Sequence, residues 1–223
     1  MSGVETPEVV TVSKSSVAGP APRLSDEEVV VARFASCSLQ IVGGILAIFS
    51  VFTVWFYLSG GGVATQFYPG ASFKANGKFM TYASQGLGPV GGLYDAVLVL
   101  GVVGGALLLV GGALLLLEAV HRRPARPSRN TWIALSGVAV MAFAWVIAPG
   151  LQPWALHHST ATACSGWTGT SPCSLPWGSG SQMGVSYTFF MADGWIIMLG
   201  ALTLATVGLV IGYLGRNLSL IHI

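Results

Sequence analysis

Four long apolar runs alternate with polar or glycine-rich segments along this chain. The runs cover residues 35–58, 93–117, 132–148 and 194–214. Uncharged stretches of about 20 residues are long enough to cross a bilayer, where every backbone group must find its partner within the protein. Each run is therefore predicted to be a transmembrane helix. The third run is the shortest, so we expect it to stand nearly upright or to continue through Pro149.

Composition supports a membrane location. Hydrophobic residues make up 53% of the chain, charged residues only 8%, and the mean hydropathy is +0.71, whereas soluble domains contain about 25% charged residues. A water-soluble fold could not cover such an apolar core. The predicted fold class is an all-α polytopic membrane bundle of at least four helices over residues 25–217. A small irregular or β-hairpin-containing extracytoplasmic region completes the prediction.

Basic residues predict the orientation in the membrane. Eight of the ten Lys and Arg residues lie in the tail before the first run, in the linker HRRPARPSR or after the last run. Only Lys74 and Lys78 fall on the opposite side. Because basic loops remain inside, both termini are predicted to be cytoplasmic in a multi-pass plasma-membrane protein. This asymmetry accounts for the arginines, so no nucleic-acid partner is expected.

The two ends of the chain are predicted to lie outside the helical bundle. Residues 1–24 are rich in Ser, Val, Pro and Glu, which predicts a disordered cytoplasmic tail. Ser25 and Glu28 have the spacing of a capping box, so the first helix is predicted to begin at Asp26. The last six residues, LSLIHI, match the translation of CTG TCT CTT ATA CAC ATC, the mosaic end of a sequencing adapter. We interpret 218–223 as an adapter artefact; the alternative is a short native tail.

The segments between the runs predict two outer loops. The loop at about 59–92 is glycine-rich and aromatic, and its Asn76-Gly77 pair is a strong signal for a hairpin turn. A small ribbon on the membrane surface is expected there. The loop at about 150–191 is longer and contains three tryptophans, two adjacent histidines and two cysteines.

The cysteine pair Cys164 and Cys173 is predicted to form a structural disulfide on the oxidising side of the membrane. Closing a ring of about ten residues would stabilise the fold by roughly 2.5 to 3 kcal/mol. A thiol oxidoreductase would need a reactive pair and a second pair to relay to, and Cys37 lies too near the cytoplasmic end to serve. A zinc site could use both cysteines with His157 and His158, but surface imidazoles are the preferred interpretation, and no metal is expected.

Two aspartates form a second candidate site. Asp95 and Asp193 both lie in the first turn of a predicted helix that runs inward from the outer side. Their shared depth could create an outer site for a cation or a proton. The preferred interpretation is two helix starts at the interface, where the helix dipole stabilises a carboxylate.

Small residues recur on one face of each run, which predicts close helix packing within the chain or between copies. The strongest stripes place small residues three or four positions apart in the second and fourth runs. The predicted packing residues are Gly101, Gly105, Ala201, Ala205, Gly208 and Gly212.

These features predict an integral membrane protein that is not an enzyme and needs no cofactor. No phosphate loop, nucleophile elbow or HExxH motif occurs. The expected role is a structural, accessory or interaction subunit that presents a disulfide-clamped aromatic outer loop to another copy or another membrane subunit. One alternative is a small ion channel or carrier using Asp95 and Asp193; another is a membrane thiol-disulfide oxidoreductase. The layout resembles claudins and tetraspanins in topology alone, because the loop motifs of both families are absent.

Overall fold

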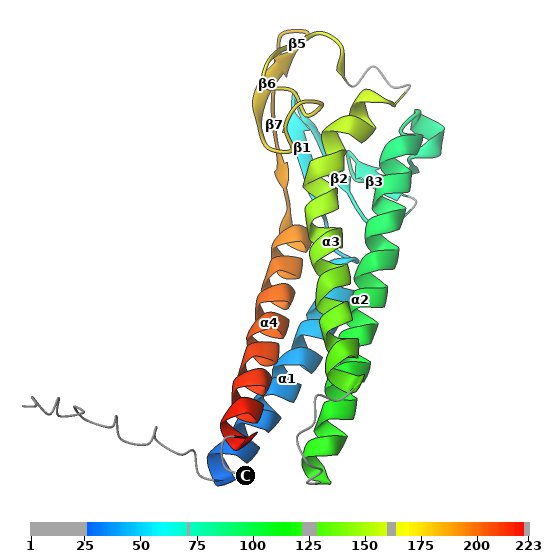
Figure 1. Ribbon diagram of the computed structural model, residues 1–223. Helices are drawn as coiled ribbons and strands as arrows, with labels where there is room; N and C mark the ends of the chain where they lie inside the picture. Colours follow the sequence, from blue (N-terminus) through cyan, green and yellow to red (C-terminus); the bar gives the residue numbers. More distant parts are fainter. Residues whose placement is uncertain (1–25, 71, 122–128, 160–163, 221–223) are drawn as a thin grey trace, which may run out of the picture.

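The computed structural model describes residues 26–70, 72–121, 129–159 and 164–220 (Figure 1). Over these residues the chain forms four long helices and a sheet at one end of them. The helices are α1 (Asp26–Ser50), α2 (Gly88–Val120), α3 (Arg129–His157) and α4 (Asp193–Leu220). The predicted tail 1–24, Ser25 of the predicted capping box and residues 221–223 of the adapter-like segment lie outside the described residues.

The first helix ends earlier than its apolar run predicts. α1 stops at Ser50, and residues 56–60 form a strand, so the predicted span 35–58 is wrong over residues 51–58. The carbonyl of Ser50 accepts hydrogen bonds from Thr53 Oγ1 at 2.7 Å and from the Trp55 indole at 2.8 Å. The following sequence, VFTVWFY, is rich in β-branched and aromatic residues that favour strands. Hydropathy alone does not distinguish the two conformations.

The helices α2 and α3 are longer than a bilayer requires. They contain 33 and 29 residues, which at 1.5 Å per residue gives roughly 50 and 44 Å against about 30 Å of hydrocarbon. α3 continues through Pro149 and Pro153, so the predicted span 132–148 is only part of it. The ends of both helices therefore stand beside the sheet, beyond the ends of α1 and α4 (Figure 1).

A proline in α3 creates a polar link to α4. Pro149 has no N–H, so the carbonyl of Trp145, four residues earlier, lacks its helical donor. Trp195 of α4 donates its indole N–H to this oxygen at 3.0 Å. The rings of Trp145 and Trp195 also stack, with centroids 4.7 Å apart. This pair joins two helices that otherwise contact each other much less than α1 contacts α4 or α2 contacts α3.

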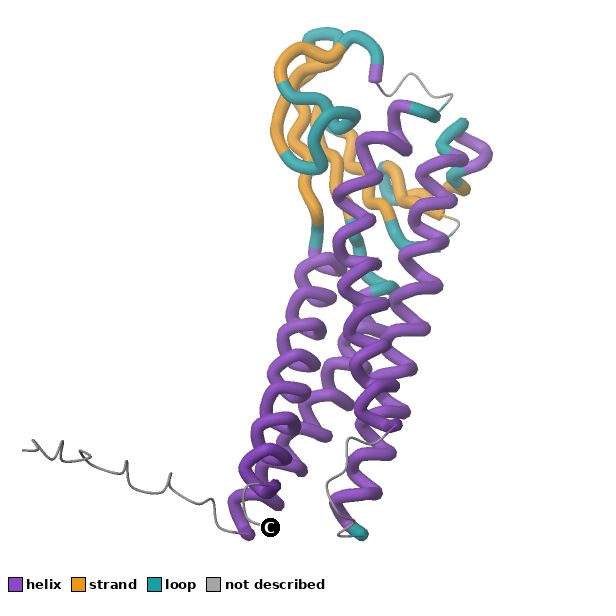
Figure 2. The backbone as a smooth tube through the Cα atoms, viewed as in Figure 1, coloured by secondary structure: helices purple, strands orange, loops and turns teal. Residues whose placement is uncertain are grey.

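The connection between α1 and α2 and the connection between α3 and α4 both contribute to a single antiparallel sheet (Figure 2). The first loop provides β1 (Phe56–Gly60), β2 (Val63–Phe67), β3 (Ser72–Ala75) and β4 (Lys78–Thr81). The second provides β5 (Trp167–Gly169), β6 (Gly178–Gln182) and β7 (Val185–Met191). Among the described residues the strand order is β4-β3-β2-β1-β7-β6-β5. The predicted all-α class with a small irregular or hairpin-containing region is therefore wrong, because seven strands form one continuous sheet.

The central strands β1 and β7 pair because they extend from paired helices. α1 leads into β1, β7 leads into α4, and the two helices pack together. The ladder runs from Phe56 opposite Met191 to Gly60 opposite Tyr187. This pairing joins segments far apart in the sequence, so the local patterns of the two loops do not predict it.

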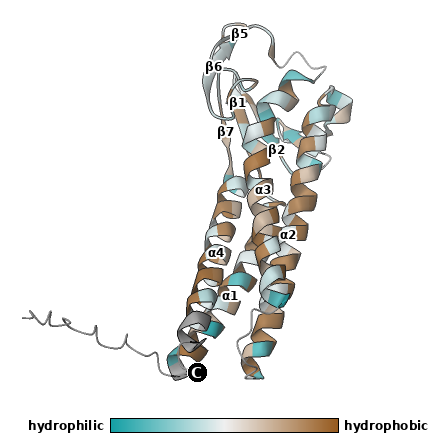
Figure 3. Cartoon of the chain, viewed as in Figure 1, coloured by the Kyte–Doolittle hydropathy of each residue, from teal (hydrophilic) through white to brown (hydrophobic). Residues whose placement is uncertain are grey.

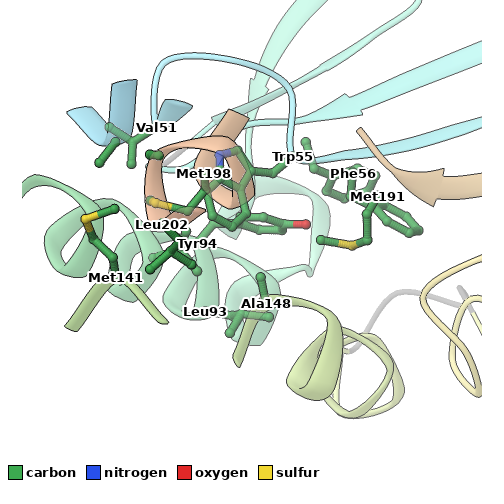
Figure 4. Close-up of a cluster of buried hydrophobic side chains, with 14 of the residues drawn as sticks. Val51, Trp55, Phe56, Leu93, Tyr94, Met141, Ala148, Met191, Met198 and Leu202 are labelled. Carbon is green, nitrogen blue, oxygen red and sulfur yellow. The ribbon is translucent and has the colours of Figure 1, made fainter. Parts of the chain in front are cut away.

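Trp55 lies where the sheet meets the helices and is fully buried. Its backbone N–H donates to Phe67 O at 2.9 Å, and its carbonyl accepts from Ala192 N at 2.8 Å. Gly194 packs against the indole so closely that an added Cβ would overlap the ring. Figure 4 shows Trp55 in the buried cluster that also contains Val51 and Met198.

Glycine pairs allow α2 to approach both of its neighbours. Gly104 and Gly111 face α3, whereas Gly105 and Gly112 face α1. An added Cβ at Gly105 would lie 2.8 Å from the carbonyl oxygen of Gly44. The two Gly-Gly pairs are seven residues apart, or about two helical turns. Each neighbouring helix therefore faces two glycines on the same side of α2.

The four long helices are rich in apolar residues, which appear as brown stretches along the ribbons in Figure 3. Large apolar side chains are exposed on their outward sides. Ile45, Phe49, Val99, Phe143 and Ile196 are all more than half exposed. The described part of the chain contains four helices that are long and apolar enough to cross a membrane. Small residues inside and large apolar residues outside are the arrangement expected of helices packed in lipid.

Candidate functional site

Three two-residue turns connect neighbouring strands within the described sheet. They are Gly61-Gly62, Asn76-Gly77 and Met183-Gly184, and φ is positive at both residues of each. This is the type I′ pattern, which favours Asn, Asp and Gly because few other residues tolerate a left-handed backbone. The hairpin predicted at Asn76-Gly77 is present, and Asn76 Oδ1 accepts a hydrogen bond from Ala64 N at 3.2 Å.

Met183 departs from the usual chemistry of such a turn. Its φ is 53° and its side chain is 83% exposed. A left-handed conformation costs an ordinary L-residue roughly 1 to 2 kcal/mol, and nothing in the sheet covers the apolar side chain. An apolar residue in a strained and exposed position is therefore a candidate contact residue.

The turn at Met183 lies beside the turn between β1 and β2. An added Cβ at Gly61 would be 2.6 Å from Val185 Cγ1, so the two turns are in contact. Val63 and Val185, which flank them, are also exposed. We call Gly61, Gly62, Val63, Met183 and Val185 the crest; it lies at the end of the sheet farthest from α1 and α4.

The crest carries no charge, and neither does a long stretch of the chain that contributes to it. No Asp, Glu, Lys or Arg occurs from residue 130 to residue 192. The edge strand β4, in contrast, begins with Lys78, and Lys74 lies on the neighbouring strand with its Nζ 5.7 Å from the Phe79 ring. Lysines on an edge strand discourage further pairing. Depletion of charge with exposed Met is typical of an interface core.

The predicted disulfide is present and clamps the outer edge of the sheet. Cys164 and Cys173 are bonded with their Cα atoms 5.7 Å apart. The closed ring contains the whole of β5. Within it, the Trp167 ring lies against Tyr187 and Phe189 of β7, with centroid separations of 5.5 and 6.0 Å. Cys37 is buried in α1, far along the chain from this clamp.

The structure places Asp193 in the first turn of α4, as predicted, but the predicted first-turn position of Asp95 is wrong, because α2 begins at Gly88 and Asp95 is its eighth residue. Both side chains are exposed, and neither forms a hydrogen bond or an ion pair with the described residues. Gly101 of α2 and Met198 of α4 are neighbours. Gly101 lies six residues after Asp95, and Met198 lies five residues after Asp193, so the two carboxylates lie at similar depths along the bundle. Nothing in these contacts joins the two carboxylates into one site.

The histidines pack against tryptophan. His158 Nδ1 is 2.9 Å from Trp154 O, and its ring lies 4.5 Å from the Trp154 ring. The rings of His157 and His158 are 5.5 Å apart. No group of three His, Cys, Asp or Glu side chains capable of holding a metal occurs among the residues that the structure describes.

The predicted packing residues lie at helix contacts. An added Cβ at Gly208 or Gly212 of α4 would meet Ser36 of α1, and one at Gly101 would overlap Val51. Ala201 and Ala205 are fully buried. Gly105 lies at the α1–α2 contact described above.

Sequence reasoning missed two buried polar links between helices. Ser36 Oγ donates to Gly208 O at 2.6 Å between α1 and α4, and Gln40 lies beside it. Tyr94 of α2 donates its hydroxyl proton to Gln152 Oε1 of α3 at 2.7 Å. Gln40, within the first apolar run, is the signal that could have indicated the first link, because such a group is costly in hydrocarbon without a partner. Gln152 lies in the predicted outer loop at about 150–191, so no comparable signal in the sequence indicates the second.

An aromatic cluster lies under the sheet next to α2. Tyr82 is nearly fully buried, and its ring is 5.3 Å from Phe73 and 6.0 Å from both Phe67 and Tyr94. Its hydroxyl donates to Tyr68 O at 2.9 Å. Burial raises the pKa of Tyr82 well above the ordinary 10.0, the bond to Tyr68 lowers it less, and the nearby Asp95 raises it slightly.

No protein-family model, curated protein or solved structure matches this chain at a significant level. The fold therefore defines only a class, a helical bundle with candidate membrane spans whose two loops share one disulfide-clamped sheet.

Proposed function

We propose that this chain is a non-enzymatic integral membrane protein that docks a partner protein through the crest. The partner is a second copy of the chain or another membrane subunit that reaches the same side of the bilayer. The observation that carries this proposal is Met183, an exposed apolar side chain in a left-handed turn. Its cost to the isolated protein is offset if a partner covers the side chain.

The arrangement of charges supports a defined orientation in the plasma membrane. The sheet lies at one end of the helices, and the arginine-bearing linker between α2 and α3 begins at the opposite end. By the positive-inside rule, this arrangement favours cytoplasmic termini and a sheet on the outer side. A membrane-impermeant maleimide should label Asn76→Cys in intact cells and Ser128→Cys only after permeabilisation. The reverse labelling would contradict this orientation.

Two turns with similar φ angles allow docking through the crest to be tested with a matched control. Asn76-Gly77 and Met183-Gly184 have nearly the same backbone conformation, but Lys78 lies beside the first and no charge lies beside the second. A photoreactive phenylalanine at position 183 should cross-link to a protein in native membranes. The same residue at position 76 should not. Equal cross-linking at the two turns, or none at either, would contradict docking through the crest.

Met183→Asn distinguishes docking from a structural role. Asn suits a left-handed turn better than Met does, so the variant should be at least as stable as the natural protein. Its association with the cross-linked partner should nevertheless weaken, because the apolar contact is lost. A variant that is less stable but associates normally would indicate that Met183 serves the fold alone.

The contacts favour this role over the alternatives. The exposed and separate carboxylates of Asp95 and Asp193 do not support a channel or carrier site. A thiol-disulfide oxidoreductase would need a relay to the Cys164–Cys173 bond, and Cys37 belongs to the buried face of α1.

A further inference from the structure

The inner face of the sheet lines a partly open cavity of about 360 Å³. Alternate residues of a strand point to the same side, and the inward set provides most of the lining. β1 contributes Phe56 and Leu58, and β2 contributes Thr65 and Phe67. Because the exposed crest and this cavity occupy different parts of the sheet, each can be tested without the other.

Both edges of the sheet reach this cavity, which shows that the sheet is curved around it. Met80 of β4 and Trp167 of β5 line opposite ends, although five strands separate them in the strand order. Leu156 of α3 and Pro172 of the disulfide ring also line the cavity. The clamp at β5 therefore holds one wall of the cavity in place.

The lining is mostly apolar and carries no charged side chain; its polar members are Thr65, Gln85 and Gln182. Phe56, Phe67 and Phe73 are almost completely buried there. No carboxylate, Lys or Arg is available to neutralise an ion, so the chemistry favours an uncharged occupant. The volume falls at the lower end of the range of about 300 to 1,000 Å³ found for small-molecule sites, which are also mostly apolar.

One polar group in the wall lacks a partner. Thr65 is only 8% exposed, and its hydroxyl forms no hydrogen bond with the residues that the structure describes. Thr65 Oγ1 is therefore available to a molecule inside the cavity. The oxygen is not fully buried, so a ligand in the cavity that carries a matching group can reach it and bond to it.

We propose that the cavity under the sheet binds an uncharged, largely apolar small molecule that carries one hydrogen-bonding oxygen. The aromatic and aliphatic walls bury its hydrocarbon part, and the Thr65 hydroxyl bonds to its oxygen. Phe56, Phe67 and Phe73 supply the apolar contacts. The site is a feature of the sheet, and it does not depend on docking through the crest.

Paired photoaffinity probes can test this site in lipid nanodiscs. The first probe is decanol carrying an aliphatic diazirine, and the second is the matching decane, which lacks the hydroxyl. Peptide mapping should find both probes on cavity walls such as Phe73 and Trp167. The alcohol should label them more strongly than the alkane by about 2- to 10-fold, the range that one hydrogen bond supplies.

Two variants test whether probe labelling depends on the Thr65 hydroxyl and on the space within the cavity. Thr65→Val keeps the shape of the side chain and removes the hydroxyl, so the preference for the alcohol should disappear while alkane labelling persists. Ala75→Phe fills part of the cavity, so labelling by both probes should fall. Retention of the Cys164–Cys173 disulfide and of the helical circular dichroism signal reports that each variant is folded.

Three outcomes would overturn the proposal. The first is labelling confined to lipid-facing positions such as Val99 and Phe143, unchanged in both variants. The second is equal labelling of the walls by the two probes in the natural protein, since no oxygen would then be recognised. The third is an alcohol preference that survives in Thr65→Val. Failure of cross-linking at Met183 would leave all of these readouts unchanged.

Discussion

A close approach between the backbones of two helices gives the strongest prediction of this structure. Gly44 of α1 and Gly105 of α2 face each other, and each added Cβ would lie 2.8 Å from the other residue's carbonyl oxygen. At Gly105 the new carbon would also lie 2.7 Å from Ile48 Cγ1. Because the obstructing oxygen belongs to the backbone, Gly105→Ala can be accommodated only if one helix moves.

The expected cost follows from two opposing effects. Forcing extra volume into a packed contact destabilises a protein by about 1 to 3 kcal/mol. Replacing helical glycine by alanine gains about 1 kcal/mol of helix propensity. Gly200 of α4 has no neighbouring atom within 4 Å of an added Cβ, so Gly200→Ala provides the propensity gain without the clash. The difference between the two variants should therefore equal the packing term, about 1 to 3 kcal/mol.

Reversible unfolding in mixed micelles can measure this difference. Increasing fractions of dodecyl sulfate in dodecyl maltoside would unfold each variant, with helix content followed by circular dichroism. Gly105→Ala should unfold at a lower fraction of dodecyl sulfate than Gly200→Ala. If their free energies of unfolding agreed within about 0.5 kcal/mol, the usual range for harmless surface substitutions, the close contact between α1 and α2 would be refuted.

Two further predictions concern single hydrogen bonds. Trp195→Phe should lower the free energy of unfolding by about 0.5 to 1 kcal/mol because Trp145 O loses its donor. The loss should shrink in a Pro149→Ala background, where the restored N–H of residue 149 can serve the same oxygen; equal losses in both backgrounds would contradict the account. For Tyr82, burial raises the folded-state pKa above the ordinary 10.0, so above about pH 10 the unfolded chain loses the proton first and stability falls as pH rises. Tyr82→Phe should lose stability near neutral pH but show a shallower decline above pH 10; parallel declines would exclude Tyr82 as the cause.

The helices could be predicted from the sequence because their signal is local. Apolar runs of sufficient length identify each of the four long helices that the structure describes. The Asn76-Gly77 hairpin and the Cys164–Cys173 disulfide also follow from short spacings, and both are present. In each case the deciding interaction joins residues that are close in the chain.

The sheet could not be predicted in the same way. Its central pairing joins β1 to β7, and no local pattern records that Phe56 lies opposite Met191. The first apolar run predicts a helix over residues 51–58 because an apolar strand has the same hydropathy as a helical run. The cavity depends on that pairing, since its lining combines residues of the first loop with Trp167 of the second. Thr65 therefore has no distinguishing feature in the sequence.

The contacts of Trp55 indicate that the position of the sheet is coupled to the packing of the helices. The indole N–H bonds to the last carbonyl of α1, and the backbone of the same residue bonds to β2 and to the residue before α4. Gly194 leaves room for the ring, so a larger residue there would displace either the indole or the start of α4. A shift between α1 and α4 would consequently move β1 relative to β7, which are the two strands that connect the first loop to the second. The crest and the cavity both span that boundary, because each is lined by residues from both loops. Their geometry is therefore determined as much by the close contacts of small residues between α1 and α4 as by the sheet itself.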